Sequence, residues 1–175
     1  MGVTSEKWMT GTLTGVPTTA CLLGELVAVW SFLEHTLPKP LAKILGITEN
    51  AAEAILFALN NTSARIDIVK TVATRHASDA DKAKYLDALV EIDKVSKIRN
   101  AYMHQLVGYT EEKRLVRWDF RSEMSQPQRR VYIRNEDIED AIMQMRDCYN
   151  LIIAATAPEI GAPPPWRSKR FKKRS

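Results

Sequence analysis

One uninterrupted helical pattern constrains the fold of this chain more than any other feature. Between Ser78 and Val107 there is no glycine or proline, and apolar residues recur every three or four positions, as on the buried face of a helix. The segment Ser78-Asp79-Ala80-Asp81 has the composition of a capping box, which predicts where this helix begins. Gly108 is the first residue that breaks the pattern. A helix of about 25 residues or more indicates an elongated, mainly helical protein.

Other segments show the same periodicity and recognisable boundaries. A helix is expected from Pro17 to about Leu37, where prolines end it, and Asn135 is expected to cap the last helix. Thr48 is expected to cap a helical region that breaks or kinks near residues 60–63 and continues to about His76. Residues 41–45 are interpreted as a short turn that ends at Gly46.

Two β-prone runs lie between the long helix and the last one. Residues 114–120 and 129–134 are rich in β-branched and aromatic residues, and the polar loop between them contains Pro127. This pattern predicts a hairpin. The fold class expected is mainly α: a helical bundle of four to five helices with a small β-hairpin inserted before the last helix.

The length of 175 residues suits a single domain. Residues 1–16 show no periodicity and are expected to form a flexible N-terminus, residues 17–158 the helical domain, and residues 159–175 a basic tail led by prolines. Residues 166–175 hold six of the 25 basic residues and none of the 21 acidic ones. Because the rest of the chain is slightly negative, the net charge of +4 does not indicate a basic fold surface.

Composition also limits the kinds of metal site, cofactor and location that are expected of this chain. The two cysteines form no CxxC pair and the three histidines fit no zinc spacing, so no metal and no cofactor are expected. Two widely separated cysteines favour a reducing, cytoplasmic location, with both thiols buried and inert. The apolar stretch 20–33 is interrupted by Glu25, has no preceding basic region and is short for a membrane span. No signal peptide or transmembrane segment is therefore expected.

The chemically most specific segment is residues 99–104, near the end of the long helix. On a helical wheel Arg99 falls in the middle of the apolar face, while Asp93, Asn100 and His104 share one edge. A guanidinium on an apolar face is costly without a partner. Arg99 is therefore expected to meet an internal carboxylate or to face a cleft or subunit interface.

The residues of this segment suit phosphodiester chemistry. A neutral imidazole at His104 can take a proton from a ribose 2′-hydroxyl, and the Arg99 guanidinium can stabilise a phosphorane. Asn100 can orient the imidazole, and Asp93 can support that polar row. One helix does not point both groups at one spot, so two copies about a two-fold axis are expected to complete a cleft. The alternative is a structural role, since an arginine shortly before a histidine also occurs by chance.

The segment Lys97-Ile-Arg-Asn-Ala-Tyr-Met-His104 resembles the signature of the HEPN superfamily, in which Arg, often followed by Asn, precedes His by four to six residues. Ser63-Ala-Arg-Ile-Asp-Ile-Val69 and the hairpin after the motif look like the mannitol-repressor-like branch. The resemblance covers roughly residues 22–155. It implies a helical bundle that acts as a dimer.

Many HEPN proteins are metal-independent ribonucleases of toxin–antitoxin pairs, phage defence or RNA processing. The resemblance implies that Arg99 and His104 are catalytic, that Asn100 supports them, and that an antitoxin or regulatory protein is a partner. Leu106 stands where members modified by a nucleotidyltransferase antitoxin carry Tyr, so the resemblance does not extend to that modification. Mannitol-repressor-like members imply the alternative, a non-catalytic helical regulator or protein-interaction module, so enzymatic activity is left open here.

Basic residues outside the motif suggest a path for RNA. The hairpin region concentrates the arginines Arg114, Arg117, Arg121, Arg129 and Arg130. They are candidate RNA-binding residues, although exposed strands also carry charge to remain soluble. The tail, with Trp166 and Phe171 among its cations, fits either an anchor for RNA or an anionic membrane, or a solvated end.

Overall fold

The computed structural model describes residues 8–9, 13–103, 106–110, 115–118 and 130–158. Six α-helices occur in these residues: α1 (Pro17–Glu34), α2 (Pro38–Leu45), α3 (Glu49–Phe57), α4 (Thr62–His76), α5 (Asp79–Met103) and α6 (Asn135–Thr156). They also contain a short 3-10 helix (Leu13–Gly15) and the strands β1 (Trp8–Met9), β2 (Leu106–Thr110), β3 (Leu115–Trp118) and β4 (Arg130–Ile133). The expected fold class, a mainly α bundle with a small hairpin before the last helix, is confirmed.

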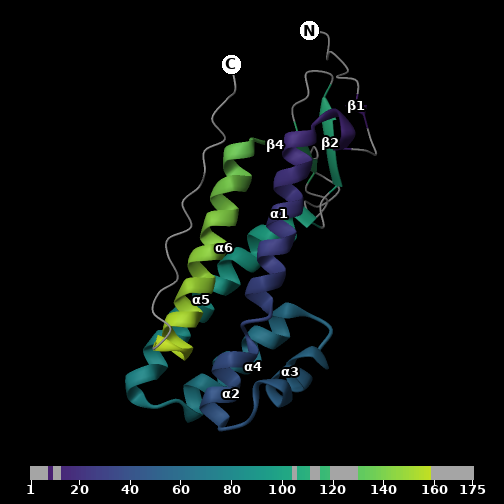
Figure 1. Ribbon diagram of the computed structural model, residues 1–175. Coiled ribbons are helices and arrows are strands. Elements are labelled where there is room, and N and C mark those ends of the chain that lie inside the picture. The colour runs from purple at the N-terminus through teal and green to yellow at the C-terminus, as the bar shows by residue number, and fades with distance from the viewer. Residues whose placement is uncertain (1–7, 10–12, 104–105, 111–114, 119–129, 159–175) are drawn as a thin grey trace, which may run out of the picture.

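The helices form an elongated bundle with the sheet at one end. Helices α1 and α6 lie side by side, and α5 crosses behind them in Figure 1 and packs on α6 and α4. Helices α2, α3 and α4 cover the end opposite the sheet. The segment expected as a turn at residues 41–45 belongs to α2, because Pro38 and Pro40 occupy its first turn, where proline is tolerated.

The sheet is antiparallel with the order β1-β2-β3-β4. The expected hairpin is present as β3 and β4, with Leu115 opposite Ile133 and Trp118 opposite Arg130. Strand β2 follows α5 directly and pairs with β3. Strand β1 differs from the expectation of a flexible N-terminus, because Trp8 pairs with Thr110. A strand of two residues is too short to show an alternating pattern in the sequence.

Most of the expected helix starts agree with the structure. The Thr48 hydroxyl accepts a hydrogen bond from the Ala51 amide at the start of α3. The break expected near residues 60–63 separates α3 from α4, where the Asn61 side chain accepts from the Ala64 amide at 2.7 Å. Both contacts satisfy amides that have no partner within the helix.

The predicted capping residue of the last helix is wrong. Arg134, not Asn135, occupies the N-cap of α6, and the Asp137 carboxylate accepts from the backbone amide of Arg134 at 3.0 Å and from its guanidinium at 2.7 Å. These hydrogen bonds with Arg134 lower the pKa of Asp137. The Asn135 side chain instead accepts from the Thr19 hydroxyl at 2.7 Å, which joins the start of α6 to the start of α1. The sequence favoured Asn135 because asparagine is a frequent cap.

A large core runs through the bundle, and a small second cluster contains Ala73, Tyr85 and Ala155. Helix α1 buries Leu26, Trp30 and Leu33, and its partners contribute the expected stripes of α5 and α6. By length and composition, the stretch Pro17–Leu45 is also apolar enough to cross a membrane, a test that core helices of soluble proteins pass as well. In this fold the stretch supplies part of the core, so its apolar composition does not indicate where in the cell the protein is located.

Candidate functional site

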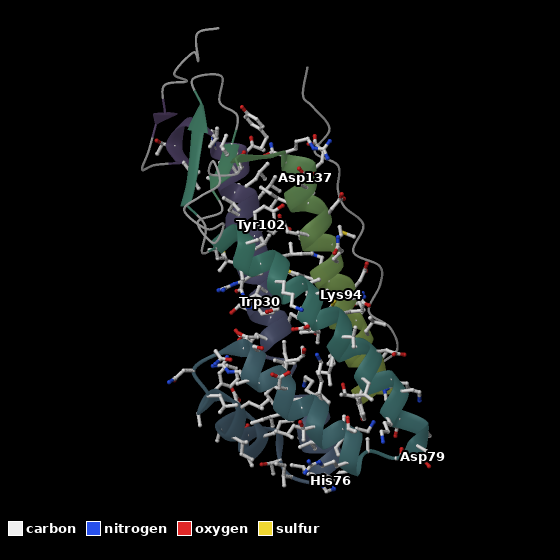
Figure 2. The ribbon with its side chains drawn as sticks, turned by 180° about the vertical axis from the view of Figure 1, so that it is seen from behind. Trp30, His76, Asp79, Lys94, Tyr102 and Asp137 are labelled. Carbon is white, nitrogen blue, oxygen red and sulfur yellow. The ribbon has the colours of Figure 1, made fainter. Side chains whose placement is uncertain are left out.

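Arg99 lies near the C-terminal end of α5 and is half-buried. Its guanidinium carbon is 6.0 Å from the centre of the Trp30 ring on α1, and its Nη1 donates to the Asn100 side-chain oxygen at 3.0 Å. Trp30 lies midway along the bundle in Figure 2, where α5 crosses α1. The aromatic ring accommodates the stem and face of a guanidinium whose charged edge faces elsewhere. This position explains how an arginine is tolerated on the apolar face of the helix.

A cleft of about 810 Å³ opens beside this arginine. It is lined by the end of α1, the connection between α3 and α4, the first turn of α4, and α5. The lining residues are Glu34, Asn60, Asn61, Thr62, Ser63, Ala64, Arg65, Asp67, Arg99 and Asn100. The two helical segments that carry the family resemblance, at residues 63–65 and 99–100, are far apart in the sequence and line the same cleft. Arg99 therefore faces a cleft, which is one of the alternatives expected for it.

Glu34 organises one wall of this cleft. Its Oε1 accepts from the Thr62 hydroxyl at 2.5 Å and from Arg65 Nη1 at 2.7 Å. The Arg65 side chain is only 13% exposed. Its guanidinium lies 4.3 Å from the centre of the Phe57 ring. A shielded carboxylate with two donors is held in a fixed position.

Arg65 also completes the end of a helix. Its Nε donates to the carbonyls of Leu56 and Leu59, and its Nη2 donates to Leu59 at 2.8 Å. These carbonyls lie at the C-terminus of α3, where backbone acceptors lack partners within the helix. In the sequence, Arg65 and Asp67 open a helix and suggest an ordinary surface pair, and this prediction is wrong for Arg65, which is largely buried. Arg65 pairs with Glu34 and joins α1, α3 and α4.

Asp93, predicted to support the motif, has a different set of described contacts. Its carboxylate accepts from Lys97 at 2.9 Å and lies 4.0 Å from Lys70 on α4. The hydrogen bond from Lys97 lowers the pKa of Asp93. These contacts join α5 to α4, and Asp93 is not among the residues that line the cleft.

Several predicted site residues lie outside the described residues: His104, Arg114, Arg121 and Arg129. For Arg117 and Arg130 the structure gives the backbone alone, in β3 and β4. The roles of these residues stay predictions. His104 follows the last residue of α5, so the described site contains the arginine and asparagine of the motif.

The charges of the cleft balance. Arg65 and Arg99 face Glu34 and Asp67, so these four side chains carry no net charge. In the described part of the chain no three His, Cys, Asp or Glu side chains are grouped as metal ligands would be. The arrangement suits hydrogen bonding to a polar ligand, with guanidinium groups as fixed donors.

Glu34 and Thr62 were not predicted from the sequence. One signal was available, since Glu25 and Glu34 are the only charged residues between Pro17 and Leu37. A charge at the end of a mainly apolar helix indicates a specific partner. The partner itself, Arg65, lies in another helix and could not be assigned from spacing.

No family model, no curated protein and no solved structure matches this chain. The resemblance to HEPN domains therefore rests on short segments of sequence. The arrangement of those segments around one cleft is a property of the fold that spacing alone did not provide.

Proposed function

We propose that this chain is a metal-independent endoribonuclease of the HEPN type. The observation that carries the proposal is the position of Arg99, which lines an open polar cleft together with Asn100 and the Ser63–Arg65 segment. His104 follows five positions after Arg99, one residue beyond the end of α5.

In the proposed reaction His104 acts as the general base. Its neutral imidazole takes the proton from a ribose 2′-hydroxyl, and the 2′-oxygen attacks the adjacent phosphorus. Arg99 stabilises the additional negative charge of the phosphorane. The bond to the 5′-oxygen then breaks, and the leaving oxygen takes a proton from water while the His104 imidazolium returns its proton to the solvent, which gives a 2′,3′-cyclic phosphate and a 5′-hydroxyl end.

Asn100 and the Glu34 wall act on the geometry of the site. The hydrogen bond from Arg99 to the Asn100 oxygen restricts the orientation of the guanidinium. Glu34, Thr62 and Arg65 fix the opposite wall. We infer that Asn100 is a positioning residue, and that replacing it lowers the rate of cleavage without abolishing it.

RNA affinity must come largely from outside the cleft, because the four charged side chains named above cancel. We propose that Arg114, Arg117, Arg121, Arg129 and Arg130 supply contacts to the backbone of RNA. An RNase of this kind fits a cytoplasmic role in a toxin–antitoxin pair or in phage defence, with an antitoxin or regulatory protein as partner.

The second candidate function is a non-catalytic helical regulator. It is favoured by the hydrogen bonds within the cleft, where Glu34 is bonded to Arg65 and Asn100 to Arg99. Polar groups that satisfy one another stabilise a fold without any ligand. In this alternative the cleft is a joint between α1, α4 and α5.

The test is cleavage of single-stranded RNA in the presence of EDTA. We expect the purified protein to form 2′,3′-cyclic phosphate ends, and His104→Ala to slow cleavage by about 100-fold or more. Arg99→Lys retains the charge but loses the planar fork, so it is expected to be strongly impaired.

His76→Ala is the matched control. His76 is exposed at the end of α4, and it lies at the opposite end of the molecule from Tyr102 in Figure 2. Cleavage by His104→Ala at the wild-type rate contradicts the proposed mechanism. Absence of cleavage by the wild-type protein, with all variants folded, supports the regulator.

A further inference from the structure

One carboxylate in the cleft takes no part in the contacts that hold its walls. Asp67 is exposed on α4 and lines the cleft. Arg65, two residues earlier, donates to Glu34 and to backbone carbonyls instead. Lys70, three residues later, lies 4.0 Å from Asp93 on α5. Among the described residues no donor is bonded to the Asp67 carboxylate, so both of its oxygens are open to a ligand in the cleft.

The pairing of α4 with α5 determines where this carboxylate lies along the cleft. Helix α4 ends at His76 and α5 begins at Asp79, at the same end of the molecule in Figure 2, so the two packed helices run antiparallel. Ser63 on α4 and Arg99 on α5 line the cleft together. Asp67 follows Ser63 by four residues, on the same side of the helix and about 6 Å further along its axis. The cleft therefore carries a guanidinium and, about one helical turn away, an open carboxylate.

These two charges remain after the other pair in the cleft is neutralised. Glu34 accepts from Arg65 at 2.7 Å, and both side chains are largely shielded from solvent. A matching ligand has an anionic group for Arg99 and, at a short distance from it, N–H donors for Asp67. The cleft volume of about 810 Å³ is in the range of sites that enclose small ligands, about 300–1,000 Å³. A single nucleotide of RNA meets these requirements, with its phosphate as the anion and its base as the donor.

The four bases of RNA differ in the donors that they offer to a carboxylate. Guanine presents two adjacent N–H groups, at N1 and N2, on its Watson–Crick edge, which match the two carboxylate oxygens. Adenine and cytosine present one amino group beside a ring nitrogen that is an acceptor, and uracil presents one N–H between two carbonyls. An acceptor that faces a carboxylate oxygen is repelled. Bases of single-stranded RNA are accessible on this edge, so a carboxylate in the cleft favours guanine.

We propose that Asp67 is a specificity-determining residue that binds the Watson–Crick edge of guanine in single-stranded RNA, while Arg99 contacts a phosphate next to that base. The inference rests on the proposed function in that RNA is the ligand of the cleft. A carboxylate repels the phosphates of RNA, so Asp67 supplies a preference among bases and not general affinity. The preference is for the nucleotide that occupies the cleft.

The experiment measures binding to the full-length protein by fluorescence anisotropy. The probes are short oligouridines that contain a single guanine, adenine or hypoxanthine, with 2′-fluoro groups in place of the 2′-hydroxyls to prevent cleavage. We expect the guanine probe to bind the wild-type protein about tenfold more tightly than the adenine probe. Hypoxanthine lacks the N2 amino group of guanine and is expected to give an intermediate affinity.

Asp67→Asn is the variant that tests the assignment. Its amide retains the size of the side chain but presents one donor and one acceptor, so the preference for guanine over adenine is expected to fall below about twofold. Asp87→Asn is the matched control, because Asp87 is an exposed acid of α5 outside the cleft lining and its replacement changes the net charge equally. Circular dichroism verifies that each variant is folded.

Three results overturn the inference. The first is that the wild-type protein binds none of the probes, and the second is equal affinity for guanine and adenine. The third is an equal loss of affinity for every probe in Asp67→Asn, which is the result expected if the carboxylate binds a ribose hydroxyl.

Binding also separates this inference from the proposed function. A guanine preference that depends on Asp67, without cleavage of natural RNA, supports the inference and contradicts the proposed ribonuclease activity. Cleavage of natural RNA with no preference for guanine supports the ribonuclease activity and overturns the role of Asp67.

Discussion

Helix α1 separates two surfaces of opposite chemistry. On one flank Glu34 accepts hydrogen bonds from Thr62 and Arg65, which fix one wall of a polar cleft. On the other flank Phe32, two residues earlier, is exposed beside an apolar pocket. Polar groups are costly to leave unpaired, so the cleft is ordered by its own contacts. Apolar groups have no directional requirement, so the second flank is free to be covered by a partner. The two flanks are therefore expected to respond differently to substitution.

The largest loss of stability is expected at Trp30, which supports both the core and the position of Arg99. Trp30 is buried in the core, and its ring lies under the Arg99 guanidinium. Trp30→Ala is expected to lower the free energy of unfolding by about 4 kcal/mol and to impair cleavage. Urea unfolding measures the loss. Val27→Ala, at an exposed position on the same helix, serves as control with an expected change below about 0.5 kcal/mol.

The next largest effect is expected from a substitution that changes the cleft alone. Arg65→Met removes the ion pair with Glu34 and the side-chain donor to the Leu59 carbonyl, whereas the Leu56 carbonyl still accepts from the Leu59 amide. We expect the free energy of unfolding to fall by about 2 kcal/mol, with cleavage reduced.

Arg75→Met provides the comparison for that substitution. Arg75 is exposed in the last turn of the same helix α4, and its replacement is expected to cost less than about 0.5 kcal/mol. An equal loss of stability in the two variants contradicts the structural role of Arg65.

A smaller effect is expected at the start of α6. Asp137→Ala removes the acceptor for the Arg134 amide and guanidinium. The expected loss is about 1 kcal/mol at neutral pH, with the rate of RNA cleavage unchanged. Asp140→Ala, at an exposed acid one turn further along α6, is expected to have less effect.

This contribution depends on pH in a defined direction. The hydrogen bonds with Arg134 lower the pKa of folded Asp137, so the stabilisation is complete above the unfolded pKa of about 3.9 and is lost as the pH falls through the lower folded value. The stability difference between the wild-type protein and Asp137→Ala should therefore shrink below about pH 4. A difference that grows on acidification contradicts the assigned hydrogen bonds.

The smallest effect is expected from chemical modification of the two cysteines, whose thiols are free and differ in burial. Cys21 is exposed on α1, whereas burial raises the pKa of Cys148 to about 12. A thiol reagent at neutral pH should modify Cys21 alone in the native protein and both cysteines in denaturant. Modification of both cysteines at equal rates in the native protein would contradict the burial of Cys148.

The sequence predicted those parts of the fold that depend on local pattern. The long helix α5, the break before Thr62 and the β3–β4 hairpin each have a capping residue, a breaker or an alternating run. The two-residue strand β1 has no such signal, because it is defined by its backbone pairing with β2, which is distant in the sequence. The prediction that both cysteines are buried is wrong for Cys21. The residue type alone does not indicate whether a small apolar side chain lies on the buried or the exposed side of its helix.

For the site, the sequence identified the motif but not its surroundings. The wheel placed Arg99 on the apolar face and left open whether it meets a carboxylate or a cleft. The answer depends on Trp30 and Glu34, which come from α1, and on the connection before α4. Such contacts between distant segments arise from packing, which periodicity within one helix does not encode.

The pairing of Trp8 with Thr110 has a consequence for the order of folding. During synthesis β1 leaves the ribosome before its partner strand, which follows only after α1 to α5 have been made. Long-range pairings are slow because the closure of a large loop must precede them. The helices can form and pack from local contacts in the meantime. The edge of the sheet is therefore expected to be completed late and to open early, ahead of the bundle, when native-state hydrogen exchange is followed residue by residue.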